Sequence, residues 1–391
     1  MKRRTTRNVF LIAALVIVIV SISAWSNLRR EMPQPAWITA DQRDNFLYGS
    51  VGAERDAGIP YWIWLALPRM FPEYMPGNGG YVSLGMSWEE GKEMPAGFSK
   101  KTVGYIRVAG NCALCHAASY RSGPDEGPEV VPVIPGRAVD VQALLTFFRQ
   151  CAQDPRFNST EIMAEINSAT KLTLIDSLLY RYVLIPRTKQ KLLSQNLVLL
   201  DAALQQHSQD PHSDGHLSKA ELRPLTVWVK NFKAPQYPLA WDGALVDTGK
   251  VLFGQHCGSC HAPDGKRTGT LIPLAEIGTD REFANTRNSS GYIAQSLDRI
   301  WVRGPYLHNG SVPTIGDLLK TPAQRPTTFY RGNNLLNTRD IGFVSDLPHE
   351  KGLHFTPFDT TKPGNSDSGH LFGTALSDQQ KKEIIEYLKT L

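Results

Sequence analysis

Two short stretches of the sequence carry a pair of thiols followed directly by an imidazole. Both have the pattern C-x-x-C-H, and their residues are Cys112, Cys115 and His116 in the first and Cys257, Cys260 and His261 in the second. Two thiols three residues apart on one helical turn can form thioether bonds to the two vinyl groups of a haem, and the adjacent histidine then binds the iron. The motifs predict two covalently attached haem c groups.

Other uses of paired cysteines fit less well. The pairs of a zinc ribbon normally lie about 15–20 residues apart, whereas most of the chain separates these two motifs. A thioredoxin-like redox pair would follow a strand, but Val251–His256 before the second motif continues a helical pattern. The fifth cysteine, Cys151, lies in an apolar helical pattern and is expected to be a buried free thiol.

The ligand opposite each motif histidine decides whether the iron carries electrons or offers an open site for chemistry. All seven methionines lie at or before Met163, so the second haem can draw only on histidine. The candidates are His308, His349, His354 and His370. We predict that His370 binds the second iron, because its loop directly precedes the terminal helix and can fold back over the haem.

The first haem differs, because no histidine occurs between His116 and His207. The methionines that precede this motif in an aromatic segment are Met70, Met75, Met86 and Met94. We expect a labile or open sixth position under aromatic side chains, with ligation by one of these methionines as the alternative. Trp301 is a weaker candidate for an electron relay, because most tryptophans are core residues.

The N-terminus predicts export. Four basic residues among the first seven precede an apolar run over residues 9–24, which is long for a signal peptide and slightly short for a spanning helix of about 20 residues. We expect an uncleaved anchor at residues 1–30 in the bacterial inner membrane, with the body in the periplasm, or secretion to the periplasm if the signal is cleaved. The net charge of +5 comes from this N-terminus, so no nucleic-acid partner is expected.

An all-α fold is expected, with two cytochrome c-like haem domains joined by helices. A tether at 31–45 follows the anchor. The first haem domain, with a helical extension, is predicted at 46–235, and the second cytochrome c domain at 236–391. No run of residues alternates convincingly as a strand would.

Three regions show apolar residues at helical spacing: 139–206, Leu245–His256 and Ser377–Leu391. By contrast, the aromatic and glycine-rich stretch 46–98 predicts irregular structure. Between the helical regions, Asp210–Glu221 has the spacing of a calcium-binding loop, except that a histidine takes its third position. A simple connection between two helices is the alternative to a calcium site there.

Several motifs resemble a known family. Gly304–Thr314 is similar to the motif that follows the second haem-binding sequence in the di-haem cytochrome c peroxidase superfamily. Tyr48–Ser50, Gly58–Trp62, Arg107–His116 and the Gly369–Leu391 ending resemble the branch of bacterial rubber oxygenases. The resemblance extends over roughly the chain from the tether onward. The chain is shorter than a rubber oxygenase, and it lacks the histidine that many di-haem peroxidases have soon after the first motif.

The resemblance implies roles for individual residues. His116 and His261 would be proximal ligands, His370 the distal ligand of haem 2, and His308 a structural or propionate contact near haem 2. Haem 1 would meet peroxide or oxygen, and haem 2 would handle electrons from a donor or acceptor protein or the quinone pool. The expected function is a membrane-anchored periplasmic oxidoreductase of the peroxidase or oxygenase-like kind. The alternative is a non-enzymatic electron carrier with both haems six-coordinate.

Overall fold

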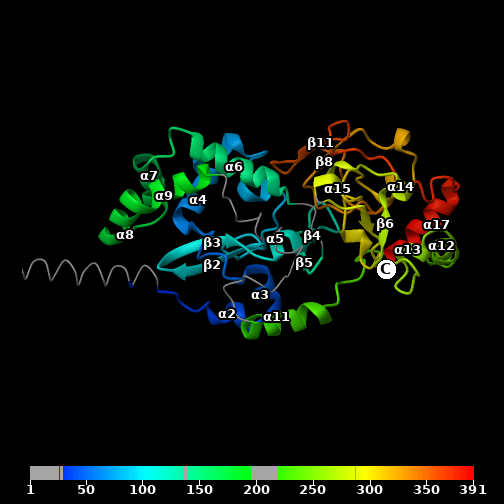
Figure 1. Cartoon of the computed structure of the whole chain (residues 1–391), viewed down its shortest axis with the longest axis horizontal. Helices are drawn as coiled ribbons and strands as arrows, with labels where there is room; N and C mark the ends of the chain where they lie inside the picture. Colours follow the sequence, from blue (N-terminus) through cyan, green and yellow to red (C-terminus); the bar gives the residue numbers. More distant parts are fainter. Residues whose placement is uncertain (1–25, 27–29, 135–138, 195–218, 287) are drawn as a thin grey trace, which may run out of the picture. The chain divides into compact units, whose positions relative to one another are not determined.

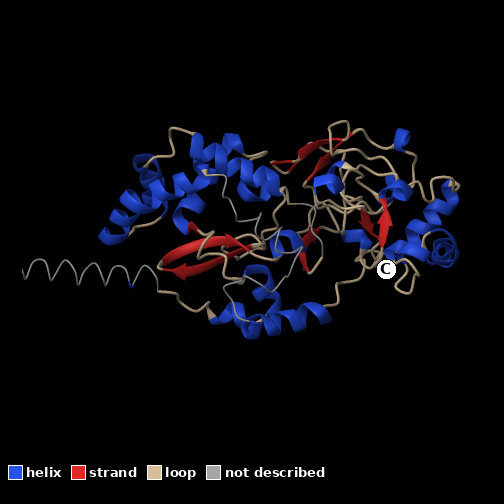
Figure 2. Cartoon of the chain, viewed as in Figure 1, coloured by secondary structure: helices blue, strands red, loops and turns tan. Residues whose placement is uncertain are grey.

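The computed structural model describes residue 26 and residues 30–134, 139–194, 219–286 and 288–391. These parts contain both helices and strands (Figure 1, Figure 2), so the expectation of an all-α fold is wrong. The sheets are β1 (Ile59–Pro60), β3 (Tyr105–Gly110) and β2 (Phe98–Val103); β4 (Ala117–Tyr120) with β5 (Glu129–Pro132); β6 (Leu271–Pro273) with β7 (Gly291–Ile293); β8 (Thr328–Arg331) with β11 (Thr356–Asp359); and β9 (His349–Glu350) with β10 (Leu353–His354). All of these pairings are antiparallel.

The β2–β3 pair shows why the strands escaped prediction. Lysines at two successive positions of β2 break the alternation of apolar and polar residues. Lys101 is nearly buried because its ammonium group forms an ion pair with Glu31, and the ammonium group of Lys100 lies 4.8 Å from the ring centroid of Tyr61. These two contacts stabilise the lysine charges, so β2 contains polar residues at both positions. Its sequence therefore does not alternate between apolar and polar residues.

The helices are α2 (Ala36–Ala40), α3 (Gln42–Tyr48), α4 (Tyr61–Met70), α5 (Ala113–His116), α6 (Val141–Gln153), α7 (Ser159–Ala169), α8 (Leu174–Leu179), α9 (Ile185–Leu193), α11 (Lys219–Asn231), α12 (Gly243–His256), α13 (Gly258–His261), α14 (Leu274–Ile277), α15 (Glu282–Thr286), α16 (Ile315–Leu318) and α17 (Asp378–Lys389). The helix predicted before the second motif is confirmed as α12. The terminal helix is confirmed as α17, with Ser377 and Gln380 forming the capping box that its sequence predicts. In contrast, α4 lies within the stretch predicted to be irregular.

The chain divides into two compact units, each assembled from separate segments. Unit 1 takes residues 1–70, 98–111 and 151–225, and unit 2 takes residues 71–97, 112–150 and 226–391. Both C-x-x-C-H motifs therefore belong to unit 2. The division of the chain into consecutive haem domains at 46–235 and 236–391 stays a prediction.

Unit 1 packs α4 against α7. Ile63, Trp64 and Leu67 of α4 are fully buried, and α7 contributes further buried aliphatic side chains. Cys151 is also fully buried, as expected for a free thiol in an apolar helix. The side-chain amide of Asn111 donates hydrogen bonds to two carbonyl groups at the end of α3, at 3.1 and 3.0 Å, and so fixes the residue directly before the first motif.

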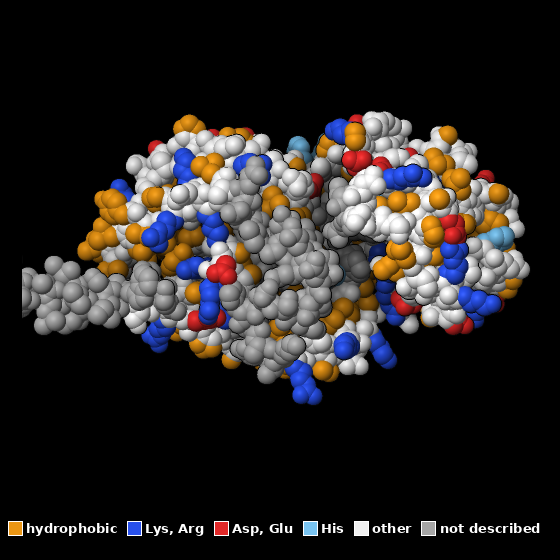
Figure 3. Space-filling model, in the orientation of Figure 1, with side chains coloured by type: hydrophobic (Ala, Val, Ile, Leu, Met, Phe, Trp, Pro, Cys, Tyr) orange, Lys and Arg blue, Asp and Glu red, His pale blue; other side chains and the backbone are white. Residues whose placement is uncertain are grey.

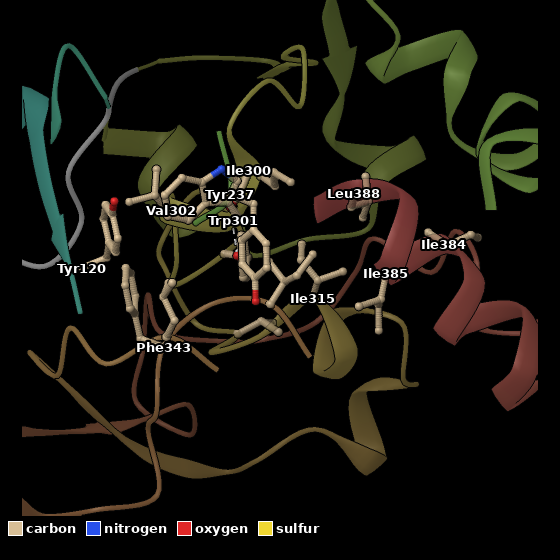
Figure 4. Packing of buried hydrophobic residues seen from close by; sticks show 14 of the residues in the cluster. Tyr120, Tyr237, Ile300, Trp301, Val302, Ile315, Phe343, Ile384, Ile385 and Leu388 are labelled. Carbon is tan, nitrogen blue, oxygen red and sulfur yellow. Dashed lines mark hydrogen bonds between the residues drawn. The ribbon is translucent and has the colours of Figure 1, made fainter. Parts of the chain in front are cut away.

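Unit 2 is built around Trp301, whose side chain has no exposed surface. Its indole ring meets Tyr120 of β4 edge to face at a centroid distance of 5.0 Å, and Tyr237 in the same way at 5.6 Å. Figure 4 shows this aromatic group together with aliphatic side chains from neighbouring loops and from α17, including Ile315 and Leu388. One core therefore includes the strand that follows the first motif and the helix that ends the chain.

No helix in the described part of the chain is long and apolar enough to cross a membrane. The anchor expected at residues 1–30 lies, apart from residues 26 and 30, outside the described residues. The structure therefore gives no support to the membrane anchor in our expected architecture.

Charged side chains are spread over the surface. In the face that Figure 3 shows, lysine and arginine side chains are scattered singly among other residues. Several of them are paired with carboxylates, as in the contact of Arg267 with Glu276. Exposed pairs of this kind contribute little to stability, because solvent and salt screen the attraction.

Candidate haem sites

The two C-x-x-C-H motifs fold into the same single helical turn. In the first, the carbonyl oxygen of Cys112 accepts hydrogen bonds from the backbone N–H groups of Cys115 at 3.3 Å and His116 at 3.0 Å. In the second, the carbonyl of Cys257 accepts from Cys260 at 3.2 Å and His261 at 3.0 Å. Each turn brings two thiols and one imidazole together, as attachment of a haem by two thioether bonds requires.

The elements around the two motifs differ. The second motif follows α12 directly, and Cys257 caps the C-terminus of that helix. The first follows strand β3, which is the order found in thioredoxin-like redox pairs, but α5 has only four residues and leads straight into strand β4. A long helix starting at the cysteines, which a thioredoxin-like site would need, is absent from this described segment.

Burial favours the protonated form of three motif thiols, those of Cys112, Cys115 and Cys257. It raises the pKa of Cys257 to about 11 and also raises the pKa values of Cys112 and Cys115. Thiolate is the reactive form in disulfide exchange, so these side chains are poorly suited to redox exchange between themselves.

An open cavity of about 240 Å³ lies beside the second motif. Its walls are His256, Cys257, Ser259, Cys260, His261, Arg267, Ile272, Glu276, Ile277, Thr279, Tyr292, Ile293, Ala294, Leu307, His308, His370 and Phe372. Ile293 and Phe372 line this cavity, yet about half of the surface of each residue is exposed. A large planar ligand bound in the cavity would cover these apolar side chains.

The imidazole rings of His261 and His370 both line this cavity. Their centroids are 6.1 Å apart, and the ring planes are inclined by 42°. Two imidazoles bound to one metal ion from opposite sides at about 2.0 Å would place their centroids roughly 6.3 Å apart. The distance between the two rings therefore fits one iron between them.

His261 is oriented through its own ring. Its Nδ1 atom lies 2.7 Å from the carbonyl oxygen of Gln295, so Nδ1 carries the proton and Nε2 is left to bind a metal. Burial lowers the pKa of His261 and favours the neutral imidazole that metal ligation requires.

His370 is oriented through its backbone. It has φ +49° and follows Gly369 with φ +84°, two successive left-handed residues that turn the loop toward the cavity. Its backbone N–H donates to the carbonyl of Ile277 at 2.8 Å. Burial lowers the pKa of His370 to about 4, so the imidazole is neutral at neutral pH, whereas its Nδ1 has no hydrogen-bond partner.

The other candidate histidines lie in different places. His308 lines the same cavity, where its ring stacks on Tyr292 with centroids 4.1 Å apart and its Nδ1 lies 3.4 Å from the hydroxyl oxygen of Thr279. This position agrees with a contact near haem 2. His349 and His354 face each other across the β9–β10 hairpin and do not line this cavity.

The methionine candidates for haem 1 are core residues or lie in the other unit. Met75, Met86 and Met94 are buried within unit 2, and Met70 ends α4 in unit 1. Met86 also lines a second cavity, of about 240 Å³, that does not include the first motif. The structure therefore brings none of the four into a cavity with His116 among those described.

No cluster of three or more histidine, cysteine, aspartate or glutamate side chains that could hold a metal ion occurs among the described residues. The calcium loop predicted over Asp210–Glu221 lies outside them, apart from the start of α11, where the side chains are not described.

Sequence reasoning missed the groups that orient His261 and His370. Gln295 acts through its carbonyl oxygen, which every residue possesses, so no residue type marks it. Arg325 follows the short helical turn η5 (Pro322–Gln324) and hydrogen-bonds the loop that carries His370. A lone arginine in a loop gives no periodic signal, and only the three-dimensional contact identifies it.

Comparisons with known proteins agree with a cytochrome. Residues 291–330 match the family model described as RoxA-like, cytochrome c-like, a segment that includes the Gly304–Thr314 motif. This short match supports haem c binding and a relationship to rubber-oxygenase-like di-haem cytochromes.

Two proteins of Sinorhizobium fredii are similar to the chain over longer stretches. The uncharacterized protein y4iJ is 42% identical over 126 residues, which cover 28% of this chain and 20% of y4iJ. The uncharacterized protein y4iM is 28% identical over 221 residues, which cover 39% of this chain and 50% of y4iM. The matches thus span half or less of these relatives.

Proposed function

We propose that the protein is an exported di-haem c-type cytochrome with oxidoreductase activity of the peroxidase or oxygenase-like kind. Haem 2 exchanges electrons and haem 1 reacts with peroxide or oxygen. The periplasm is its compartment, because c-type haems are attached outside the cytoplasm. A donor or acceptor protein, or the quinone pool, exchanges electrons with it.

One observation carries the proposal: two imidazoles stand 6.1 Å apart across a cavity whose rim bears the Cys257 and Cys260 thiols. A haem bound there supplies an iron that changes its charge by one electron. His261 and His370 would hold this group from both sides, so the site would transfer electrons and exclude an added oxidant.

The chain's own side chains set the environment of that iron. Ile272, Ala294 and Leu307 supply apolar walls that keep water from the ring faces. The Nδ1–H group of His261 donates a hydrogen bond to the carbonyl oxygen of Gln295, which would increase electron donation from Nε2 to a bound metal. Two imidazole ligands would favour the ferric state more than an imidazole and a thioether would.

The first motif has a different role in this proposal. His116, Cys112 and Cys115 would hold haem 1, which would supply an iron that reacts with a small oxidant. No second histidine occurs nearby in the sequence to act as a competing ligand. The competing function is an electron carrier in which a methionine would also bind this iron.

Spin-state spectroscopy on the haem-loaded protein tests the proposal. We expect a mass increase of two haems, one low-spin signal from haem 2 and one high-spin or water-bound signal from haem 1 that changes when peroxide or cyanide is added. Two low-spin signals that do not change when peroxide or cyanide is added would favour the electron carrier. Fewer than two haems per chain would overturn both functions.

A further inference from the structure

Arg325 lies almost entirely inside unit 2, with 5% of its surface exposed. All of its hydrogen bonds go to main-chain carbonyl oxygens. The acceptors are Lys320 at 3.1 Å, Leu318 at 3.1 Å, Gly369 at 3.0 Å and His370 at 3.4 Å, together with Asp367 at shorter range. One guanidinium group therefore joins two segments that are about 50 residues apart in the sequence.

The two segments differ in how firmly they are held. Leu318 and Lys320 belong to α16 and the turn after it, and α16 anchors in the core through buried Ile315 and Leu319. By contrast, the Asp367–His370 loop contains two successive left-handed residues, of which His370 is not a glycine. A non-glycine residue in this conformation is strained, and it persists only when its surroundings hold it.

The two axial histidines are held differently. The ring of His261 is fixed by its own hydrogen bond to Gln295, but the Nδ1 atom of His370 has no hydrogen-bond partner. The His370 ring packs edge to face on Phe372, with centroids 5.4 Å apart, and its position otherwise depends on its backbone. That backbone is held at its N–H by Ile277 and at its carbonyl by Arg325.

We propose that Arg325 is the positioning residue for the axial ligand His370, fixing the loop so that the imidazole reaches the haem 2 iron. This inference rests on the proposed function, because it takes His370 as a ligand. A planar guanidinium with five donors in a rigid fork can join several carbonyl oxygens at once. A lysine ammonium group, with three donors at one point, cannot reach both segments in the same way.

Two substitutions test this role in the haem-loaded protein. Arg325→Lys keeps the charge, and Arg325→Met removes every donor while keeping much of the length. We expect ferric haem 2 to gain a high-spin fraction and to bind cyanide about 10–100-fold more tightly than the wild type. The effect should be larger for Met than for Lys, and His370→Ala defines the fully open site.

Arg121→Lys is a matched control. Arg121 is similarly buried in unit 2 and also hydrogen-bonds several groups, Asn333, Asn334 and Pro124 among them, but it does not contact the Asp367–His370 loop. We expect this variant to keep haem 2 low-spin with unchanged cyanide affinity, even if it unfolds at a lower temperature. The comparison separates loss of positioning from general loss of stability.

The outcomes are distinguishable. If both Arg325 variants fold, carry two haems and leave haem 2 fully low-spin with the cyanide affinity of the wild type, the inference is overturned while the proposed function stands. If Arg325→Met does not fold, the lysine variant alone decides. If His370→Ala leaves the haem 2 spectrum unchanged, His370 is not the ligand, and the axial assignment and the role of Arg325 fall together.

Discussion

Gly249 of α12 lies directly against the backbone carbonyl of Glu383 in α17, where a Cβ atom at position 249 would come within 1.9 Å of the oxygen. The two helices run close together in unit 2 (Figure 1). This contact allows α12 to deliver Cys257 at its end to the haem 2 cavity while α17 covers the core. A glycine is needed here for close approach, since no larger residue leaves room for the neighbouring backbone.

Gly249→Ala should therefore destabilise the protein by roughly 2–3 kcal/mol, because the helices must move apart. Urea unfolding of the haem-loaded protein measures the loss. Gly254→Ala is the matched control in the same helix, since nothing lies within 4 Å of its Cβ position. There alanine should stabilise by about 0.5–1 kcal/mol through helix propensity. Equal stabilities of the two variants would contradict the close helix contact.

Gly97→Ala should disturb the first haem site. Gly97 has φ +98°, and a Cβ there would lie 2.6 Å from the Cα of Leu114 in α5. Strain and collision together should cost about 3 kcal/mol and reduce haem attachment at the first motif. Intact mass and thermal unfolding report both effects. Gly91→Ala also has positive φ but open space, and should lose only about 1 kcal/mol with both haems in place.

His370→Ala should open haem 2. Loss of one imidazole leaves a five-coordinate or water-bound iron, so the low-spin signal should give way to a high-spin one and the reduction potential should rise. Redox titration and electron paramagnetic resonance measure these changes. His349→Ala, which alters an exposed histidine of the β9–β10 hairpin, should leave both spectra and potential as they are. A high-spin change in the His349 variant would mean that the ligand was misassigned.

Lys191 should give unit 1 a pH-dependent stability. Burial lowers its pKa to about 8, and its ammonium group donates to the carbonyl of Asp56. The unfolded chain keeps this proton up to about pH 10.4, so between these values the unfolded state binds more protons and stability rises with pH. We expect a gain of about 2 kcal/mol after allowing for partial solvent contact.

Replacing Lys191 with methionine should remove this slope and make the protein more stable than the wild type at pH 7. Urea unfolding at several values from pH 7 to pH 10 measures the free energy of unfolding of each protein. Subtracting the value for the variant from that for the wild type removes the contribution of the other titrating groups. Lys362→Met, at an exposed position, should keep the wild-type slope. A steep rise that survives in the Lys191 variant would assign the dependence to another group.

Prediction from sequence succeeded where one periodic pattern or one local motif specifies the structure. The capping box at Ser377 and Gln380 marks the start of α17, and the C-x-x-C-H spacing marks each haem-binding turn. Prediction failed for α4, because its side chains are apolar on nearly all sides and its sequence therefore shows no amphipathic period, although only part of the helix is buried. It failed for β2 because compensated lysines conceal the alternation.

The candidate site could be predicted only in part, for a related physical reason. Thiols and imidazoles are distinctive in type, so His370 could be selected from a few histidines. The contacts that orient these ligands run through main-chain carbonyls at Gln295 and Ile277 and through Arg325. Carbonyl groups are common to all residues, and their use as acceptors depends on long-range packing that a single sequence does not display.

Tyr120, four residues after His116, packs on Trp301 at the centre of unit 2. If the chain is exported from its N-terminus, the first haem-binding segment leaves the cytoplasm before residue 301, so the indole is missing when the early thiols become available for haem attachment. We expect the first haem to be attached while the chain is still unfolded. The later segment that contains Trp301 would then fix its position. Fragments that stop before residue 226 would leave this tyrosine in water and should be degraded rather than accumulate.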